Sequence, residues 1–482
     1  MHCTLLARKR RLFHKIGVSI RLCFFLPFFP ARANLAPMKV LLVFPKTPRS
    51  SCAADIFFPV PSNGLATVAA LTPREIEVEV ANEYFRPLDL RASADLVGIS
   101  VLTLNAYRAY EIAEAFRRRS IPVVMGGVHP TFCPDEALEH ADAVVCGEAE
   151  GVWPRVLGDA AAGRLQKRYQ RDGFTPASEI ALPRWDVRGG EQGRRIKAIT
   201  TTRGCPVGCD FCSVSAFHGS RFRGIELEVL VEYIRRLCEN DRPRFLFFND
   251  DNLTIDHARA ARFFEMITPL NLRWMSFASL DIVRDEKLLT LAARSGCVQF
   301  FIGFESLADE NLSLFHKGVN RPRDYARAIE LIHSHGISIQ ASFIFGLDED
   351  RPDVFRRTME FIEANHIEQP QFNILTPLPG TRLLERLRRE GRIVDDDWSH
   401  YDMNHVVFEP CHIRREQLQE GHNWAWKYAF SPTIILRRLR HIPWGRRTYN
   451  FVSNFVQRGA VNRMLRYLRR TGHYPRTGLL LS

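Results

Sequence analysis

The stretch TTRGCPVGCDFCSV, residues 201–214, decides how the rest of the chain is interpreted. It holds Cys205, Cys209 and Cys212 at the spacing C-x3-C-x2-C, whereas the other cysteines of the eleven are scattered. An odd and scattered set is not typical of a disulfide framework and indicates a reducing compartment with one metal site. Iron–sulfur clusters are held by thiolates, normally one per iron, so three thiolates on a cubane leave one iron open.

The open iron predicts a small molecule as the fourth ligand. The amino and carboxylate groups of S-adenosylmethionine (SAM) can chelate it, and an electron then cleaves a carbon–sulfur bond to give a 5′-deoxyadenosyl radical. The alternative is a structural zinc site, which needs four ligands that usually come as two pairs. His218 or Cys238 could complete such a site, but the sequence offers no second pair.

Upstream of the cysteines, the pattern alternates between strand and helix from Met38 onward. Buried or alternating strands are predicted at 39–44, 76–82, 94–102, 122–127 and 142–148, with helices at 63–71, 106–119 and 134–141. Units of this length predict an α/β domain with a parallel, doubly wound sheet, here residues 38–160. Ligands of such sheets lie outside the carboxyl ends of the strands. The polar range 161–195 is predicted to be a linker.

A second strand–helix series contains the cysteines. Strands are predicted at 196–202, 244–250, 273–279, 298–304, 337–346 and 370–377, with helical patterns between them, for example 226–239 and 322–335. Six such units predict a partial (β/α)6 barrel over residues 196–380, with its functional residues at the carboxyl ends of the strands. The cysteines follow the first of these strands directly. Residues 381–482 are predicted to be a helical, basic C-terminal region.

The net charge of +12 is concentrated at the two ends of the chain. Residues 1–37 carry seven basic residues and no acid, and residues 431–482 carry eleven arginines and no acid. The N-terminal extension looks like a signal peptide, but Arg21, Pro27 and Pro30 interrupt its apolar part, which is also too short to span a membrane. We expect Met38 to be the true start and the protein to be cytoplasmic; the alternative is a peripheral membrane anchor on the inner face of the membrane.

The C-terminal range 424–470 mixes aromatic, aliphatic and arginine residues in a basic amphipathic helical pattern. Such a pattern suits a membrane surface, and it also suits a solvated face over a core. An RNA partner is the competing explanation of the charge.

The cysteine spacing, Phe211 before the last cysteine and the position after a strand resemble the radical SAM superfamily. The resemblance implies a [4Fe–4S] cluster on the three cysteines and SAM contacts at the following strand ends: Asn249, Asp250, Asp251, Glu305, Ser306 and Gly346. It also implies that 376–381 lies near the adenine. Each residue has a simpler explanation as well: the aspartates could cap a helix, and Gly346 could serve a turn.

The first domain resembles the cobalamin-binding domain of the cobalamin-dependent branch of that superfamily. Ser100 and Leu102 fit its S-x-L signature, Gly126 and Gly127 follow at a family-like distance, and His129 is a candidate contact. The third signature, D-x-H-x-x-G after the first strand, is absent, so that loop supplies no histidine to the lower face of the cobalt. The alternative is a Rossmann-like domain without a cofactor; no G-x-G-x-x-G follows the first strand, which argues against a dinucleotide.

The family resemblance implies one of two activities. In cobalamin-dependent C-methylases, cobalamin carries a methyl group to a carbon from which the radical has taken hydrogen; in anaerobic cyclases, the radical works without methyl transfer. We expect methylation of an unactivated carbon in an apolar substrate such as a lipid, polyprenoid or tetrapyrrole, with flavodoxin or ferredoxin as reductant. The alternatives are a non-methylating cyclase or rearrangement enzyme, and a non-catalytic iron–sulfur or cobalamin carrier. Related enzymes that modify RNA carry a second cysteine trio, and Cys52, Cys133 and Cys146 are too unevenly spaced to form one, so nucleic acid is not an expected partner.

Overall fold

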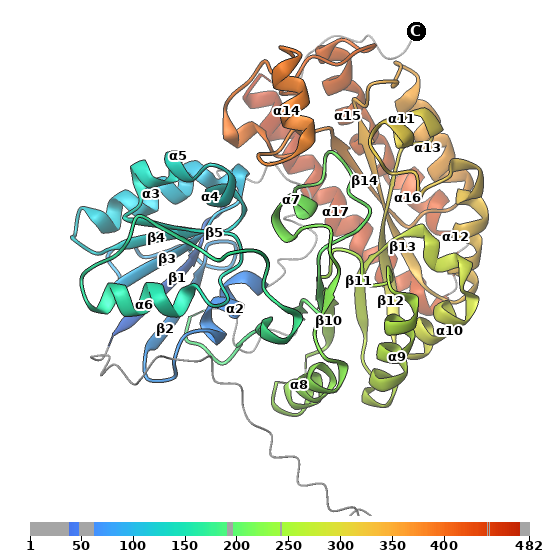
Figure 1. The fold of residues 1–482 in the computed structure, drawn as a ribbon. Coiled ribbons are helices and arrows are strands. Elements are labelled where there is room, and N and C mark those ends of the chain that lie inside the picture. Colours follow the sequence, from blue (N-terminus) through green and yellow to red (C-terminus); the bar gives the residue numbers. More distant parts are fainter. Residues whose placement is uncertain are drawn as a thin grey trace, which may run out of the picture. The chain divides into compact units, whose positions relative to one another are not determined.

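The computed structural model describes residues 38–47, 62–189, 196–241, 243–440, 442 and 444–472. The predicted N-terminal extension, 1–37, lies outside the described residues. The described part confirms the predicted fold class: a parallel six-stranded sheet precedes a second parallel six-stranded sheet, and the C-terminal region is helical (Figure 1).

The first sheet has the strand order β2-β1-β3-β4-β5-β6, and all its pairs are parallel. Helices cover both faces (Figure 1), and each face has its own apolar core: Leu65 and Trp153 belong to one, Tyr110 and Phe116 to the other. The elements are β1 (Lys39–Phe44), α2 (Asn63–Ala70), β2 (Glu77–Asn82), β3 (Leu96–Ser100), α3 (Ala106–Arg117), β4 (Val123–Gly126), α4 (Val128–Phe132), α5 (Pro134–His140), β5 (Ala143–Cys146), α6 (Trp153–Ala161) and β6 (Arg168–Gln170).

The sixth strand, β6, lies inside the range predicted to be a linker. It pairs with β5 in parallel over three residues. Only Tyr169 is buried, and Arg168 and Gln170 on either side of it are exposed. A three-residue strand with one apolar side chain has no hydrophobic run for a pattern to detect, so the sheet extends into the predicted linker without a signal in the sequence.

The second sheet has the order β14-β13-β12-β11-β10-β7, again all parallel. Its edge strands β7 and β14 are not paired with each other among the described residues, so the barrel is partial. Its elements are β7 (Ile196–Ile199), β8 (Thr202–Arg203), α7 (Ser213–His218), β9 (Arg223–Gly224), α8 (Leu227–Asn240), β10 (Phe245–Phe248), α9 (His257–Ile267), β11 (Trp274–Ala278), α10 (Glu286–Arg294), β12 (Cys297–Glu305), α11 (Asp309–Leu314), α12 (Tyr325–Ser334), β13 (Ser338–Phe345), α13 (Val354–Ala364) and β14 (Gln369–Ile374).

The C-terminal region packs onto the core of the barrel. It consists of α14 (Arg382–Arg389), the short 3₁₀ turn η7 (Trp398–His400), α15 (Arg415–Ala429), α16 (Pro432–Leu439) and α17 (Trp444–Arg470). Trp426 and Met464 belong to the same buried cluster as the barrel helices. Arg438 is fully buried and donates to the carbonyl oxygens of Ile367, Glu368 and Ala429, so this arginine of the basic tail is structural. No helix in the described part is long and apolar enough to cross a membrane.

Candidate cofactor site

The segment that leads into the cysteines is anchored by two aspartates at the end of β10. The backbone N–H and hydroxyl of Thr201, both at 2.9 Å, and those of Thr202 donate to Asp250 Oδ1. Burial raises the pKa of Asp250 to about 7. Asp251 Oδ2 accepts from the N–H of Gly204 at 2.8 Å. The predicted aspartates therefore position the cysteine loop, and their contact with SAM stays a prediction.

Gly204 has a packing reason to be glycine. Its φ is +86°, and a Cβ atom there would lie 2.2 Å from the carbonyl oxygen of Arg221. The chain therefore passes close to its own backbone immediately before Cys205, which fixes the start of the cysteine loop.

The three cysteines are free thiols on this loop. Cys209 is buried, and Cys205 and Cys212 are half-buried. Burial raises the pKa of Cys209 to about 12 in the absence of a metal. Three unpaired thiols on one anchored loop fit a cluster held by three thiolates, so this donor set suits the [4Fe–4S] group.

Asp210, between the cysteines, ties the loop to two other parts of the barrel domain. Its carboxylate lies 2.7 Å from Arg382 Nε at the start of α14 and 3.1 Å from His316 Nδ1 after α11. Its carbonyl accepts from the N–H of Leu383, and its own N–H donates to the carbonyl of Phe315. The cysteine loop is therefore held from both sides.

A buried ion pair stands beside the cysteines. Glu305, at the end of β12 with a φ of +64°, lies 3.6 Å from Lys317 Nζ. Burial alone would lower the pKa of Lys317, but Glu305 and the three cysteines raise it, so the lysine stays charged; burial raises the pKa of Glu305. A buried cation here favours thiolates and other anionic groups. The sequence predicted Glu305 as a site residue and missed Lys317, which lies in no motif.

Ser306 and Gly346 have local roles in the structure. Ser306 Oγ accepts from the N–H of Ala308 at 3.1 Å and from Asn311 Nδ2 at 3.3 Å. Gly346 has a φ of +90°, and a Cβ there would lie 2.7 Å from Leu418 Cδ2 in α15. These contacts agree with the simpler explanation of a turn and close packing, and the predicted SAM contacts of both residues remain predictions.

The carboxyl edge of the first sheet presents small side chains and backbone. Ser100, Leu102, Gly126 and Gly127 are half-buried at this edge, whereas the interiors of β3 and β4 are buried. Gly127 has a φ of +103°, and a Cβ there would lie 2.8 Å from the carbonyl oxygen of Val101. An open edge without bulky side chains fits a large planar cofactor such as cobalamin.

The side chain of His129 is buried rather than exposed at this open edge. It is fully buried, its Nε2 is 3.0 Å from the hydroxyl of Tyr110, and its ring meets Trp398 of η7 edge-on at 5.6 Å. Glu136 accepts hydrogen bonds from Tyr110 and from Trp398 Nε1, and these contacts, with His129, lower the pKa of Glu136 to about 2 against the effect of burial. The cluster favours a structural role for His129 between the first domain and the C-terminal region, and its contact with cobalamin stays a prediction.

A buried ionic cluster connects the segment after β5 of the first sheet to the residues on either side of the cysteine loop. Glu148 and Glu150 follow β5, and the cluster partners Arg203, His218 and Arg223 flank the cysteines. Arg223 donates to both oxygens of Glu148 at 2.9 Å, and His218 Nδ1 is 2.9 Å from Glu148. Arg203 donates to both oxygens of Glu150 at 3.0 and 2.7 Å. We call these five residues the Glu148 cluster. The predicted strand 142–148 ends at Glu148, and of the other members only His218 was considered, as a possible zinc ligand.

A cavity of about 350 Å³ lies where the cysteine loop, the second sheet and α4 meet. Its lining includes Val128 from α4, Phe217 from α7, and Asn249 and Phe277 from the barrel. It therefore faces the cysteine loop, the predicted SAM residues and the edge predicted for cobalamin. Asn249 is exposed into this region.

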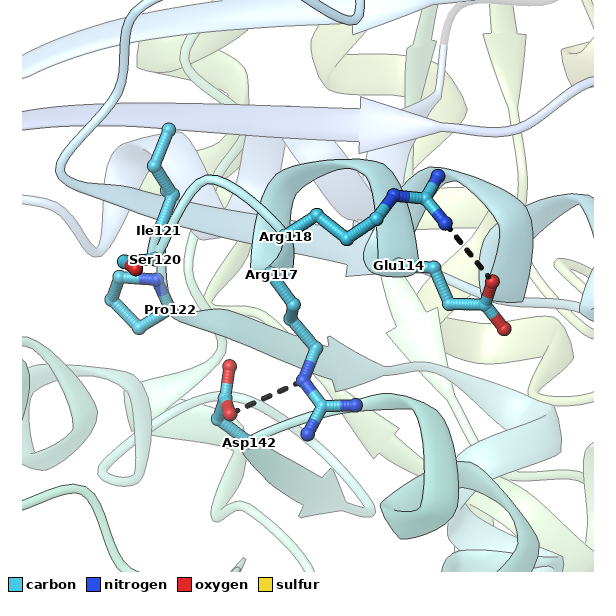
Figure 2. Close-up of a pocket in the computed structure, with 7 residues that line it drawn as sticks. All are labelled: Glu114, Arg117, Arg118, Ser120, Ile121, Pro122 and Asp142. Carbon is cyan, nitrogen blue, oxygen red and sulfur yellow. Dashed lines mark hydrogen bonds and ion pairs between the residues drawn. The ribbon is translucent and has the colours of Figure 1, made fainter.

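A second cavity, of about 510 Å³, lies at the opposite edge of the first sheet (Figure 2). It is lined by residues before β4 and at the end of α3, and its charged side chains form the pairs Arg117–Asp142 and Arg118–Glu114. This cavity lies at the amino ends of the strands, so it is distinct from the cofactor edge.

Comparison with known proteins agrees with both domains. Residues 199–362 match the model of the Radical SAM superfamily, and residues 51–157 match that of the B12 binding domain. The chain is 33% identical to the bacteriochlorophyllide d C-12(1)-methyltransferase of Chlorobaculum tepidum over 84% of this chain and 90% of that enzyme. It is 27% identical to the hopanoid C-2 methylase of Rhodopseudomonas palustris, over 85% and 80% of the two chains. It is 26% identical to the anaerobic magnesium-protoporphyrin IX monomethyl ester cyclase of Rubrivivax gelatinosus, over 67% and 63%.

A solved structure has the same fold. The radical SAM methyltransferase TsrM from Kitasatospora setae, with cobalamin and a [4Fe–4S] cluster bound, superimposes with a TM-score of 0.67 at 18% identity, over 91% of this chain and all of that one. The predicted resemblance and cofactors are confirmed: a [4Fe–4S] cluster, SAM and cobalamin. The chain belongs to the B12-binding radical SAM enzymes, a family that includes bacteriochlorophyllide methyltransferases, hopanoid methylases and anaerobic cyclases.

Proposed function

We propose that this enzyme methylates a carbon atom of an apolar, polycyclic substrate that binds in the interior of the partial barrel. When bound, the cluster and SAM supply the radical and cobalamin supplies the methyl group. The residues of the chain hold these cofactors at the carboxyl edges of the two sheets, and the barrel holds the substrate beneath them.

The observation that carries the proposal is an aromatic wall inside the barrel. Ala198, Phe247 and Met275 form a small apolar cluster with Phe245 and Phe277, separate from the main core of the domain. These residues lie on β7, β10 and β11, on the face opposite the covering helices. Phe277 also lines the cavity beside the cysteine loop, so the wall continues to the cofactor site.

The wall continues onto β12. The rings of Phe277 and Phe301 are 4.8 Å apart, and those of Phe247 and Phe277 are 5.5 Å apart. A surface of contiguous aromatic rings binds large, flat or polycyclic apolar molecules well. Two of the relatives named above act, by their names, on a bacteriochlorophyllide and on a hopanoid, which are molecules of this kind. We favour a tetrapyrrole because the more similar of the two relatives acts on one.

The test is an anaerobic assay of the full chain, reconstituted with iron, sulfide and cobalamin. Reductant and methyl-labelled SAM are added together with a chlorophyllide or a hopanoid. We expect S-adenosylhomocysteine and 5′-deoxyadenosine in similar amounts, together with label in the tetrapyrrole. Label in the hopanoid alone would indicate a hopanoid instead of a tetrapyrrole as the substrate class. Absence of label from every acceptor, despite SAM cleavage, would reject methylation.

A second candidate function is radical cyclisation without methyl transfer. The similarity to the anaerobic cyclase favours it. In the same assay it gives 5′-deoxyadenosine and a substrate that has lost hydrogen, without S-adenosylhomocysteine. The labelled methyl group therefore separates the two candidates in one experiment. Flavodoxin or ferredoxin remains our predicted reductant.

We also propose that the enzyme works in the cytoplasm and touches the inner face of the membrane through α17. Phe451, Val452 and Val456 are exposed on this helix, and Arg463 and Arg466 are exposed further along it. Apolar side chains next to arginines suit the interface of an anionic bilayer. Sedimentation with vesicles of anionic lipid tests this: the wild type should bind, a Phe451→Ser/Val452→Ser variant should bind less, and equal binding of the two would reject the contact.

A further inference from the structure

We propose that β13 and β14 form a neutral, hydrogen-bonding wall that recognises a carbonyl oxygen at the edge of a flat conjugated substrate. The inference rests on the proposed function and names one chemical feature of its substrate. We call this surface the amide wall; it consists of Gln340, Ser342, Gln371 and Asn373.

The amide wall faces the interior of the barrel. Side chains alternate between the faces of a strand. Phe343 and Phe372 point outward, because their rings pack against each other at 6.5 Å, and the ring of Phe372 packs edge-on against Trp426 of α15 at 5.4 Å. The wall residues occupy the intervening positions and therefore point inward. Phe301 is opposite Gln340 in the sheet register, so the amide wall begins where the aromatic wall ends.

The wall residues form a continuous chain of hydrogen bonds. Gln340 Nε2 donates to Gln371 Oε1 at 3.1 Å, Gln371 Nε2 donates to Asn373 Oδ1 at 3.4 Å, and Asn373 Nδ2 donates to Ser342 Oγ at 2.9 Å. A side-chain amide has two N–H groups, and each of these bonds uses one of them. The remaining N–H groups and the Ser342 hydroxyl can each donate a hydrogen bond to an acceptor on a ligand.

The wall borders accessible space. Gln340, Ser342 and Gln371 keep 7%, 5% and 8% of their surface exposed, and Asn373 is half-buried, whereas the outward-facing Ile339 and Phe372 have 0%. Strand interiors in a filled barrel would not show this difference between the two faces. The donors are therefore within reach of a molecule inside the barrel.

A fully buried amide nearby supports the same conclusion. Gln299 of β12 has the same inward orientation as Phe301, and neither its oxygen nor its nitrogen has a hydrogen-bond partner among the described residues. Buried amides in folded proteins are nearly always satisfied by protein, water or ligand. In the sheet register Gln299 is opposite Ser338, directly before the amide wall.

Helix α17 closes the barrel below the wall. Asn450 Nδ2 donates to Ser338 Oγ at 3.0 Å, and Gln369 Nε2 donates to Ser453 Oγ at 2.9 Å. Ser338 and Gln369 have the same inward orientation as the wall residues. A molecule bound at the wall therefore meets a polar floor at the amino ends of β13 and β14.

The chemistry of the wall selects among polycyclic ligands. The inward positions of β13 and β14 carry no charged side chain. Carboxylates are usually recognised by arginine or lysine, whereas neutral amides suit a neutral acceptor such as a ketone or ester. A saturated polycyclic hydrocarbon has no acceptor and would bury these donors without partners. A site built to hydrogen-bond a group strongly rejects the analogue that lacks it.

The experiment compares two chlorins that differ only in one carbonyl oxygen, which two hydrogens replace. The reconstituted full-length enzyme is titrated anaerobically with pyropheophorbide a, which carries a ring ketone, and with its deoxo analogue, in which the ketone is a methylene. Binding is followed by the red fluorescence anisotropy of the chlorin. We expect the ketone to bind about tenfold more tightly, the effect of one net hydrogen bond. In the Gln340→Met/Gln371→Met variant the ratio should fall to about one, with the deoxo chlorin bound as before.

The surface variant Gln166→Met is the matched control and should keep the wild-type ratio, because Gln166 is exposed in the first domain. The single variants Gln340→Met and Gln371→Met replace the double variant if that one fails to fold. A ratio near one in the wild type, an unchanged ratio in the wall variants, or displacement of the chlorin by an equal concentration of a triterpene hydrocarbon would each overturn the inference. Methyl transfer with equal affinity for the ketone and deoxo chlorins would support the proposed function and reject only the amide wall. A tenfold affinity ratio without any methyl transfer would support the wall and reject only the proposed function.

Discussion

The two parallel sheets offer very different carboxyl edges to their cofactors. At β3 and β4 the edge of the first sheet presents Ser100, Gly126 and Gly127, with small side chains and a backbone in close contact with itself. The edge of the second sheet is crowded with charge: Asp250 and Asp251 hold the cysteine loop, and Glu305 is paired with Lys317.

The difference follows from what each edge must hold. A bulky cofactor needs space and backbone contact, which small residues give, and a cluster with a zwitterionic co-substrate needs fixed charges close to it. Side-chain deletions should therefore impair the second edge most, and side-chain additions should impair the first. The Glu148 cluster lies between them and should affect both.

The largest expected effect is at the charged edge. Cys209→Ala should remove the iron–sulfur chromophore and lower 5′-deoxyadenosine formation by more than about 10³-fold, because two thiolates do not hold the cubane. Iron and sulfide content together with the anaerobic cleavage assay measure this. Cys411→Ala, at an exposed cysteine, is the control and should behave as the wild type. Cleavage of SAM by Cys209→Ala at the wild-type rate would contradict the assignment of the cluster to these cysteines.

The next effect tests the contact between the edges. Glu148→Gln leaves Arg223 buried without its ionic partner and should lower the free energy of unfolding by about 3–5 kcal/mol at pH 7. The exposed pair of Glu179 with Arg171 provides the control Glu179→Gln, which should cost less than about 1 kcal/mol. Urea unfolding measures both. Equal effects of the two variants would show that the cluster does not stabilise the joined domains.

The pH dependence sharpens this result. Contacts with His218 and Arg223 hold the pKa of Glu148 well below its usual value against the effect of burial. A lowered folded-state pKa stabilises the protein above the unfolded value, about 4.5, and that stabilisation is lost as the pH falls further. The difference in the free energy of unfolding between the wild type and Glu148→Gln should be constant from pH 7 to pH 5. Below pH 4.5 it should shrink by about 1.4 kcal/mol per pH unit. A difference that grows in acid would contradict the assignment.

A smaller loss is expected from the buried lysine. Lys317→Met should weaken SAM binding by about 10–100-fold, because Glu305 is left buried without its partner and a charged hydrogen bond contributes about 1.5–3 kcal/mol. Equilibrium dialysis of the reconstituted enzyme with labelled SAM measures the affinity. The exposed Lys287→Met is the control. Wild-type affinity in Lys317→Met would place this ion pair outside the SAM site.

The smallest effect tests the part of the first edge at β3 and β4 by adding a side chain. Gly127→Ala forces a side chain onto a backbone with a φ of +103° and close to the carbonyl oxygen of Val101, and should cost about 1–3 kcal/mol of stability together with cobalamin affinity. Gly163→Ala has a similarly positive φ of +64° but no neighbour within 4 Å, so it isolates the backbone strain. Thermal unfolding and cobalamin retention after gel filtration are the measurements. Equal retention in both variants would show that the edge tolerates the added side chain.

The sequence predicted the elements that carry strong periodic signals. Each predicted strand of both sheets is present, because runs such as 39–44 are largely buried on both faces and form continuous apolar segments. The strand β6 was not predicted because Tyr169 is its only buried residue. The C-terminal helices were predicted, but the sequence left open whether they cover a core. Trp426 and Met464 show that they do.

The residues of the candidate site also divide into those that the sequence predicted and those that it did not. Cys205, Cys209 and Cys212 are close in sequence, and their spacing, with Phe211 and the position after a strand, carried the resemblance that implied the cluster. The sequence did not predict the pairs Glu305–Lys317 and Glu148–Arg223, because the partners come from separate elements. Glu148 and Arg223 are 75 positions apart. A single sequence carries no signal that two distant charges meet. The contact of His129 with Trp398 was not predicted for the same reason, since Trp398 comes from the C-terminal region.

Helix α17 supplies the floor of a barrel whose strands leave the ribosome long before it. Asn450 follows its partner Ser338 by 112 positions. At about 5–20 residues per second, synthesis of that stretch takes on the order of 6–22 s. Until then β13 and β14 lack the helix that covers the amino ends of their inward faces, and the core residues that cluster with Met464 of α17 stay exposed. The enzyme should therefore depend on chaperones during translation, and premature stop codons anywhere before α17 should yield aggregated rather than merely inactive chains.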